Sequence, residues 1–162
     1  MEQQSLRMDD STEKVIQYYS DMVYRLAFAR TGTKQDADDV FQEVFLRYVR
    51  KKPIFTDEEH RKAWLIRVTI NCSNNFWSSL WNKRTQQLNE EIIFETKDTI
   101  DLFAELQQLP PKYREVIHLF YYEDMSLEEI SLALHRKNAT VRTQLTRARA
   151  MLKKFMKEED YV

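Results

Sequence analysis

Glycine and proline are scarce in this chain, which has one glycine and three prolines among 162 residues. A sheet-rich fold needs many tight turns, and these two residues supply most of the backbone conformations that tight turns require. Long helices joined by short connections need few of either residue. The sequence therefore predicts an all-α fold.

Three helices are expected in the first half of the chain. Ser11 and Thr33 are in position to cap the N-termini of the first two helices, while Gly32 and Pro53 end them. The third helix is expected to run towards Arg84. Apolar residues recur at helical spacing over residues 15–26, 37–49 and 64–76. Together these segments predict a small helical domain over residues 12–84.

A second helical domain is expected over residues 100–157. Pro110 and Pro111 suit the start of a helix, because proline is tolerated in the first turn. Residues 85–99 between the two domains are mostly polar and acidic and have no sustained period. We expect them to form a flexible linker.

The segment from Ser126 to residue 157 predicts a helix-turn-helix. Ser126 and Glu129 have the spacing of a capping box at the start of its first helix, and a break follows over residues 135–138. In the second helix, apolar residues from Val141 to Phe155 recur on one face and leave basic and polar residues on the others. The N-terminal half of such a helix can enter a major groove. A solvated basic face on an ordinary packed helix is the alternative.

The formal net charge of −1 conceals two basic blocks. Residues 47–84 hold nine basic and three acidic groups, and residues 131–157 hold eight basic groups and no acidic ones. Two separate basic blocks predict two separate contacts with a polyanion such as DNA.

Nothing in the sequence predicts an enzyme, a metal site or a cofactor site. His60, His118 and His135 lie in separate segments without metal-ligand spacing, and no glycine-rich phosphate loop is present. The single cysteine, Cys72, gives no indication of an oxidising compartment. No signal peptide and no apolar run of about 20 residues is seen, so we expect a soluble cytoplasmic protein without membrane insertion.

Several segments in order resemble the extracytoplasmic-function (ECF) group of bacterial sigma factors, part of the sigma-70 family. The segments are DADDVFQEVFLRYV (36–49), AWLIRVTINCSNNFW (63–77) and residues 109–154, which include TVR (140–142) and RAR (147–149). The resemblance covers about residues 14–84 and 100–155. It implies a region 2 and a region 4 that recognise the minus-ten and minus-thirty-five promoter elements.

The resemblance implies a role for each group of residues. The polymerase-binding residues would be Asp39, Gln42, Glu43 and Phe45, facing the clamp helices of the beta-prime subunit. The minus-ten residues would be Phe55, Arg67, Asn71, Asn74, Asn75, Trp77, Lys83 and Arg84. The minus-thirty-five residues would be Thr140, Arg142, Thr143, Gln144, Thr146, Arg147 and Arg149. Aromatic faces, amides and cations are what trapping unstacked bases and binding phosphates require.

The predicted turn departs from the family pattern. His135 stands where the family usually has glycine, Arg136 where it has an apolar residue, and Ala139 where a second glycine is common. A left-handed conformation at His135 costs about 1 kcal/mol or more compared with glycine.

The resemblance also implies partners. These are the core RNA polymerase, contacted at the beta-prime clamp helices and the beta flap, promoter DNA and an anti-sigma factor. The alternative function is a stand-alone helix-turn-helix repressor or activator, which leaves segment 36–49 and the helix over residues 63–77 without a role. The sequence therefore predicts a sigma factor that binds core polymerase and directs transcription initiation.

Overall fold

The structure is a computed structural model that describes residues 11–84 and 103–159, except for the side chains of residues 75–84, 103 and 157–159. Every element within these ranges is an α-helix, which confirms the all-α prediction. The predicted linker, residues 85–99, lies outside the described residues.

Three helices form the first bundle: α1 (Thr12–Thr31), α2 (Lys34–Lys51) and α3 (Glu58–Arg84). Ser11 caps α1, since its hydroxyl accepts a hydrogen bond from the Lys14 N–H, and Thr33 caps α2 in the same way. Gly32 ends α1 in a left-handed conformation with φ of 81°. These local signals explain why the first two helices begin and end where the sequence predicts.

The core of this bundle is aliphatic and aromatic. Its fully buried side chains include Val15, Val23, Leu26, Val40, Val44, Leu65 and Ile66. Val49 was expected in the same apolar stripe, but it is 46% exposed. It lies one residue beyond the buried Tyr48, and one residue is a rotation of about 100° around a helix, enough to carry Val49 to the outer side of α2.

The second unit contains α4 (Phe103–Gln108), α5 (Pro111–Tyr121), α6 (Leu127–Leu134) and α7 (Asn138–Glu159). Pro111 is the first residue of α5, as the sequence predicts. The capping box at α6 is present in full: the Ser126 hydroxyl accepts from the Glu129 N–H, and the Glu129 carboxylate accepts from the Ser126 N–H. Ile130, Val141, Leu145 and Ala148 fill the core between α6 and α7.

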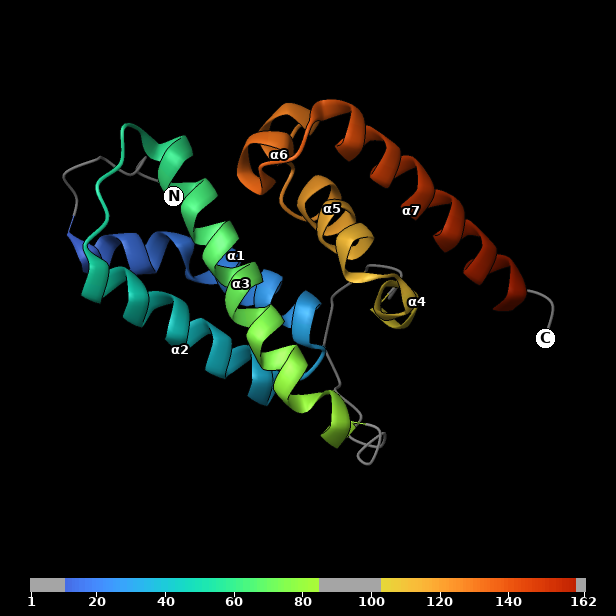
Figure 1. Cartoon of the computed structure of the whole chain (residues 1–162), viewed down its shortest axis with the longest axis horizontal. Coiled ribbons are helices and arrows are strands. Elements are labelled where there is room, and N and C mark those ends of the chain that lie inside the picture. Colours follow the sequence, from blue (N-terminus) through green and yellow to red (C-terminus); the bar gives the residue numbers. More distant parts are fainter. Residues whose placement is uncertain (1–10, 85–102, 160–162) are drawn as a thin grey trace, which may run out of the picture.

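The two units pack against each other through α1 with α5 and α3 with α6 (Figure 1). The long helix α7 extends away from α1–α3 towards the C-terminus. This arrangement places α6 over the N-terminal half of α3 and leaves one side of α7 uncovered.

Candidate nucleic-acid interface

The basic helix α7 presents most of its predicted DNA-binding side chains to solvent. Thr140, Arg142, Thr143, Thr146, Arg147 and Arg149 are exposed, and Gln144 is half-buried. Thr143 and Thr146 donate their hydroxyl protons to the carbonyls of Ala139 and Arg142, so both side chains are held along the helix. Arg142 and Arg147 offer exposed cationic groups on this helix.

Arg149 differs from the other arginines of α7. Its Nε donates to the Tyr121 hydroxyl at 2.6 Å, and its guanidinium lies over the rings of Phe120 and Tyr121. A guanidinium stacked on two rings is held in place by cation–π attraction. Arg149 thus helps to fasten α7 to α5.

The turn before α7 adopts the left-handed conformation that glycine would favour. His135 has φ of 54° and ψ of 45°, and its N–H donates to the Ser131 carbonyl. The Arg136 N–H also donates to the Ser131 carbonyl, and the Ser131 hydroxyl donates back to the Arg136 carbonyl. These hydrogen bonds hold the turn in place with a histidine at the strained position.

Arg136 joins the turn to α5 and to α7. Its Nη2 donates to Glu115 Oε2 at 2.6 Å, and its Nη1 donates to Gln144 Oε1 at 3.0 Å and to the Lys112 carbonyl at 3.4 Å. Sequence analysis identified Arg136 only as a departure from the family pattern. The structure shows that its guanidinium contacts one of the predicted base-reading side chains.

The predicted minus-ten residues of α3 differ in how far they are engaged. Asn71 and Asn74 are both exposed, and Asn74 accepts a hydrogen bond from Arg30 of α1 in the same unit. Arg67 is half-buried and donates to the Ala133 carbonyl of α6 at 3.3 Å. The side chains of Asn75, Trp77, Lys83 and Arg84 lie outside the described ones.

Phe55, one of the predicted minus-ten residues, has a buried ring. The side chain is 9% exposed and packs in an aromatic cluster with Tyr48, Trp64 and His60, beneath the guanidinium of Arg61. A ring covered by these neighbours has no face available for a base in this conformation.

Ile54, next to Phe55 in the same loop, is 93% exposed. Apolar side chains that contact nucleic acid can insert between base steps. Sequence reasoning missed Ile54, because a single apolar residue in a loop has no period that would assign it to one side.

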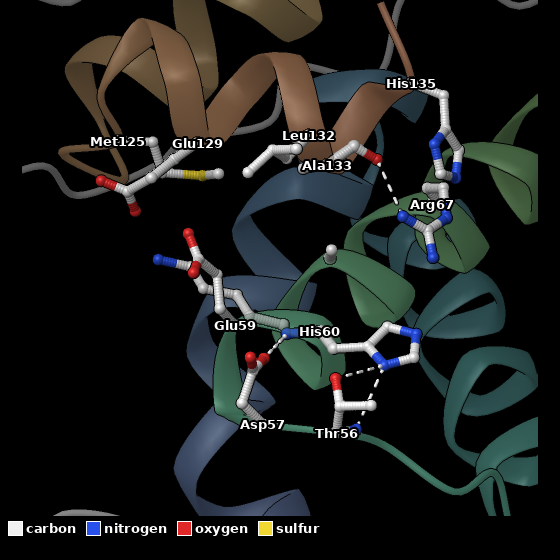
Figure 2. Close-up of a pocket in the computed structure, with 12 residues that line it drawn as sticks. Thr56, Asp57, Glu59, His60, Arg67, Met125, Glu129, Leu132, Ala133 and His135 are labelled. Atoms are coloured by element: carbon white, nitrogen blue, oxygen red, sulfur yellow. Dashed lines mark hydrogen bonds between the residues drawn. The ribbon is translucent and has the colours of Figure 1, made fainter.

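A cavity of about 280 Å³ separates α3 from α6 (Figure 2). Thr56, Asp57, His60 and Arg67 line it from the side of α3, and Met125, Glu129, Leu132 and His135 line it from the side of α6. The N-terminal half of α3 therefore faces α6 across this cavity.

The outer face of α2 carries the other predicted site. Asp39 and Gln42 are exposed and Glu43 is half-buried, where its carboxylate pairs with Arg47 at 3.0 Å. Leu46, one turn beyond, is 45% exposed, and Val49 continues the same face. This surface, Asp39, Gln42, Glu43, Leu46 and Val49, is called the α2 face below.

Phe45 was predicted to belong to the polymerase-binding surface, and the structure corrects this position. It is 6% exposed and packs edge-to-face against Phe41 at a centroid distance of 4.9 Å. Phe45 points into the bundle because it lies one turn from both Phe41 and the buried Tyr48, on the side of α2 that meets α1 and α3. Leu46 and Val49 are the apolar residues that reach the α2 face.

Two ion pairs join α1 to the second unit. Arg30 Nη1 donates to Glu115 Oε1 at 2.7 Å, and both residues are almost fully buried. Arg25 forms a two-point pair with Glu123 at 2.8 and 3.0 Å. Burial lowers the pKa of Arg30, and the carboxylate of Glu115 opposes this effect. Glu115 therefore accepts from Arg30 of the first unit and from Arg136 of the turn.

Arg114 and Gln107 hold the C-terminal end of α1. Arg114 donates to the Leu106, Gln107 and Leu109 carbonyls of its own unit and to the Ala29 and Arg30 carbonyls of α1. The Gln107 amide also donates to the Ala29 carbonyl, at 3.0 Å. The last carbonyls of a helix need partners outside it, and Gln107 and Arg114 supply them here.

Glu123 gives the contact between the units a dependence on pH. Burial raises the pKa of its carboxyl, but the His118 ring, whose Nε2 lies 3.3 Å from Oε1, and the hydrogen bonds from Arg25 outweigh burial and leave the pKa below its ordinary value of 4.5. A lowered pKa contributes stability above the ordinary value, and this stability is lost as the pH falls through the folded-state value. We expect wild type to be more stable than Glu123→Gln at pH 7, with the difference shrinking as the pH falls below 4.5 and through the lower folded-state pKa. Urea unfolding at pH 7 and through this acidic range measures the difference, and a difference that does not shrink contradicts the assignment.

The described part of the chain contains no group of three or more histidine, cysteine or acidic side chains that could hold a metal ion. Within the same part, none of the helices has the length and apolar character needed to cross a membrane.

Known proteins share both units of this chain. Residues 15–83 match the family described as Sigma-70 region 2, and residues 100–152 match the family described as Sigma-70, region 4. The ECF RNA polymerase sigma factor SigE of Mycolicibacterium smegmatis is 30% identical over 90% of this chain. The match spans 62% of the length of that relative, which is less than two thirds.

Two further proteins extend the comparison. The RNA polymerase sigma-E factor of Streptomyces coelicolor is 30% identical, and the match covers 91% of this chain and 87% of that protein. The sigma factor RpoE of Bartonella quintana, solved in complex with the anti-sigma factor NepR, shares the fold with a TM-score of 0.70 at 19% identity. That match covers 90% of this chain and 96% of RpoE. Two matched sigma regions and a relative matched along most of both chains show that this chain belongs to the sigma-70 family of RNA polymerase sigma factors, in its ECF group.

Proposed function

We propose that this chain binds core RNA polymerase through the α2 face and directs it to promoters that carry a minus-ten and a minus-thirty-five element. The observation that carries the proposal is the presence in one chain of a helix-turn-helix with exposed arginines and a second, acidic and apolar surface on α2. A stand-alone repressor needs only the first of these. A polymerase-bound initiation factor uses both.

The division of labour follows the two units. Residues 12–84 bind polymerase and the minus-ten element, residues 100–157 bind the minus-thirty-five element, and residues 85–99 link them. Acidic groups beside Leu46 and Val49 suit a basic and partly apolar partner helix, with charge complementarity guiding encounter and register. The beta-prime clamp helices are the partner that family membership suggests, and the beta flap is the partner for region 4.

The α7 surface supports recognition of the minus-thirty-five element. Arg142 and Arg147 are exposed at positions from which a helix in the major groove reaches bases and phosphates. Thr140, Gln144 and Arg147 follow each other at spacings of four and three residues, so they share one face of α7. Gln144 and Arg147 are assigned to bases, and Thr140 to the backbone.

The minus-ten assignment centres on α3 and the loop before it. Asn71 is exposed and offers an amide to base edges, and Ile54 offers an apolar contact to an unstacked base. Arg67 and Asn74 are engaged with α6 and α1 in this arrangement. Use of Arg67 on DNA requires the two units to separate, which also suits the recognition of two spaced promoter elements by one chain.

Family membership supports further assignments. We assign the chain to the cytoplasm and to non-enzymatic initiation factors, because sigma factors act together with the polymerase that performs the chemistry. We also assign it an anti-sigma partner. The shared fold with RpoE, which was solved with the anti-sigma factor NepR, supports this partner.

Arg147→Ala tests the minus-thirty-five assignment. Removing a guanidinium that contacts a base is expected to weaken transcription that depends on the minus-thirty-five element by about 1–3 kcal/mol. Lys153→Ala removes an exposed cation from the C-terminal part of the same helix and serves as the control. The measurement is in vitro transcription from a promoter with an intact or scrambled upstream element. Equal loss in both variants, or no loss in either, speaks against a base contact by Arg147.

A further inference from the structure

Gln144 is the half-buried member of the predicted DNA-reading set, and its amide faces the turn of the helix-turn-helix. Its Oε1 accepts a hydrogen bond from Arg136 Nη1 at 3.0 Å. A guanidinium carries five N–H donors and no acceptor, so the amide atom that faces it must be the oxygen. The amide nitrogen of Gln144 is therefore the atom directed away from Arg136.

Arg136 is itself fixed by groups from a second helix. Glu115 accepts from its Nη2 at 2.6 Å, and the Lys112 carbonyl accepts from its Nη1 at 3.4 Å. Glu115 is almost fully buried, and its other oxygen accepts from Arg30. Charge-assisted hydrogen bonds to a rigid, planar fork leave the guanidinium little freedom to rotate. Gln144 is thus oriented by an arginine that is already anchored.

The orientation of this amide decides which bases it can read. In the major groove, glutamine pairs with adenine by donating to N7 and accepting from the N6 amino group. Guanine and thymine present acceptors at N7, O6 and O4, while cytosine presents the donor N4 amino group. An amide whose oxygen is turned towards Arg136 presents its N–H donors to DNA, so it suits bases with acceptors and opposes cytosine.

We propose that Arg136 is a positioning residue that sets the base preference of Gln144 within the minus-thirty-five element. The proposal rests on the proposed function, since it requires α7 to read that element. The Gln144 amide then donates a hydrogen bond to an acceptor on guanine, on thymine or on adenine N7. It disfavours cytosine, which presents a donor there.

Two substitutions test the proposal by base preference. Arg136→Leu removes the partner of the Gln144 oxygen and frees the amide to pair with adenine at two points. Gln144→Glu keeps a partner for Arg136 but presents only acceptors, which suits the cytosine amino group. We expect adenine to gain about fivefold over guanine and thymine in the first variant, which is the worth of about one net hydrogen bond. In the second variant we expect cytosine to become the preferred base.

The measurement is in vitro transcription by core RNA polymerase with each full-length protein, on a promoter library randomised over the minus-thirty-five element. Sequencing the transcribed templates gives the preference at each position. Thermal unfolding of each variant is measured first, and Arg136→Lys, which keeps the charge but loses the planar fork, replaces Arg136→Leu if that variant does not fold. Wild type that rejects cytosine at one position, with both variants changed at that same position, supports the proposal.

Other outcomes overturn it in distinguishable ways. Wild type and folded Arg136→Leu with the same preference show that Arg136 does not position Gln144, while the proposed function stands. A Gln144→Glu preference identical to wild type at every position shows that Gln144 does not read a base. If wild type selects no upstream element at all, the proposed minus-thirty-five function fails together with this inference.

Discussion

Glu115→Gln is expected to destabilise the folded chain by about 3 kcal/mol, a typical cost for removing one partner of a buried ion pair. The carboxylate of Glu115 lies between Arg30, which is 3% exposed, and Arg136. A neutral amide in its place leaves the guanidinium groups facing each other without the intervening negative charge. The measurement is urea unfolding of the full-length protein, followed by circular dichroism.

Two further variants separate this effect from a general loss of acidic groups. Glu128→Gln changes an exposed carboxylate at the start of α6 and is expected to alter stability by less than about 0.5 kcal/mol. The double variant with Arg30→Met and Glu115→Gln is expected to lose less than the sum of the two single losses, because the residues contact each other. Additive losses would show that the pair is not coupled.

Leu46→Arg is expected to weaken binding to core RNA polymerase by at least about 2 kcal/mol, or roughly thirtyfold in Kd. Leu46 is the apolar residue of the α2 face that Phe45 was expected to supply, and it lies one turn beyond Gln42 and Glu43. The substitution removes apolar contact area and places a cation against a partner expected to be basic. Fluorescence anisotropy of labelled protein titrated with core polymerase measures the effect.

Tyr18→Arg is the matched control for Leu46→Arg. Tyr18 is a half-exposed aromatic residue of α1 that lies outside the α2 face and outside region 4. It is expected to leave polymerase affinity within about threefold of wild type, since most surface substitutions away from contacts have small effects. Wild-type affinity in the Leu46 variant would remove the α2 face from the polymerase interface.

The helices were predictable from sequence because their start and stop signals are local. Ser11 and the Ser126–Glu129 pair form hydrogen bonds within three residues, and Gly32 ends α1 through its own backbone conformation. From the sequence, a left-handed conformation at His135 could be predicted only as an energetic cost. The hydrogen bonds that hold this conformation come from Ser131, four residues earlier, whose carbonyl and hydroxyl both bond to the turn.

The candidate site was less predictable, because it depends on which side of each helix meets a neighbour. Phe45 was expected at the surface and is buried, whereas Val49 was expected in the core and is exposed. The stripe of apolar residues on α2 is wider than the side of the helix that is buried, so the sequence does not show which edge of the stripe is covered. Phe55 is covered by partners from α2 and α3. The Arg30–Glu115 pair joins residues 85 apart in the sequence, a distance at which charge patterning gives no information about contacts.

The most direct test of the central claim is in vitro transcription by core RNA polymerase on fragmented genomic DNA of the source organism, with and without this protein, followed by sequencing of transcript starts. We predict starts that appear only when the protein is present and that share two spaced upstream motifs. The same core polymerase supplied with a known sigma factor is the activity control. Activity in that control, but no starts that depend on this chain, would contradict its assignment as an initiation factor.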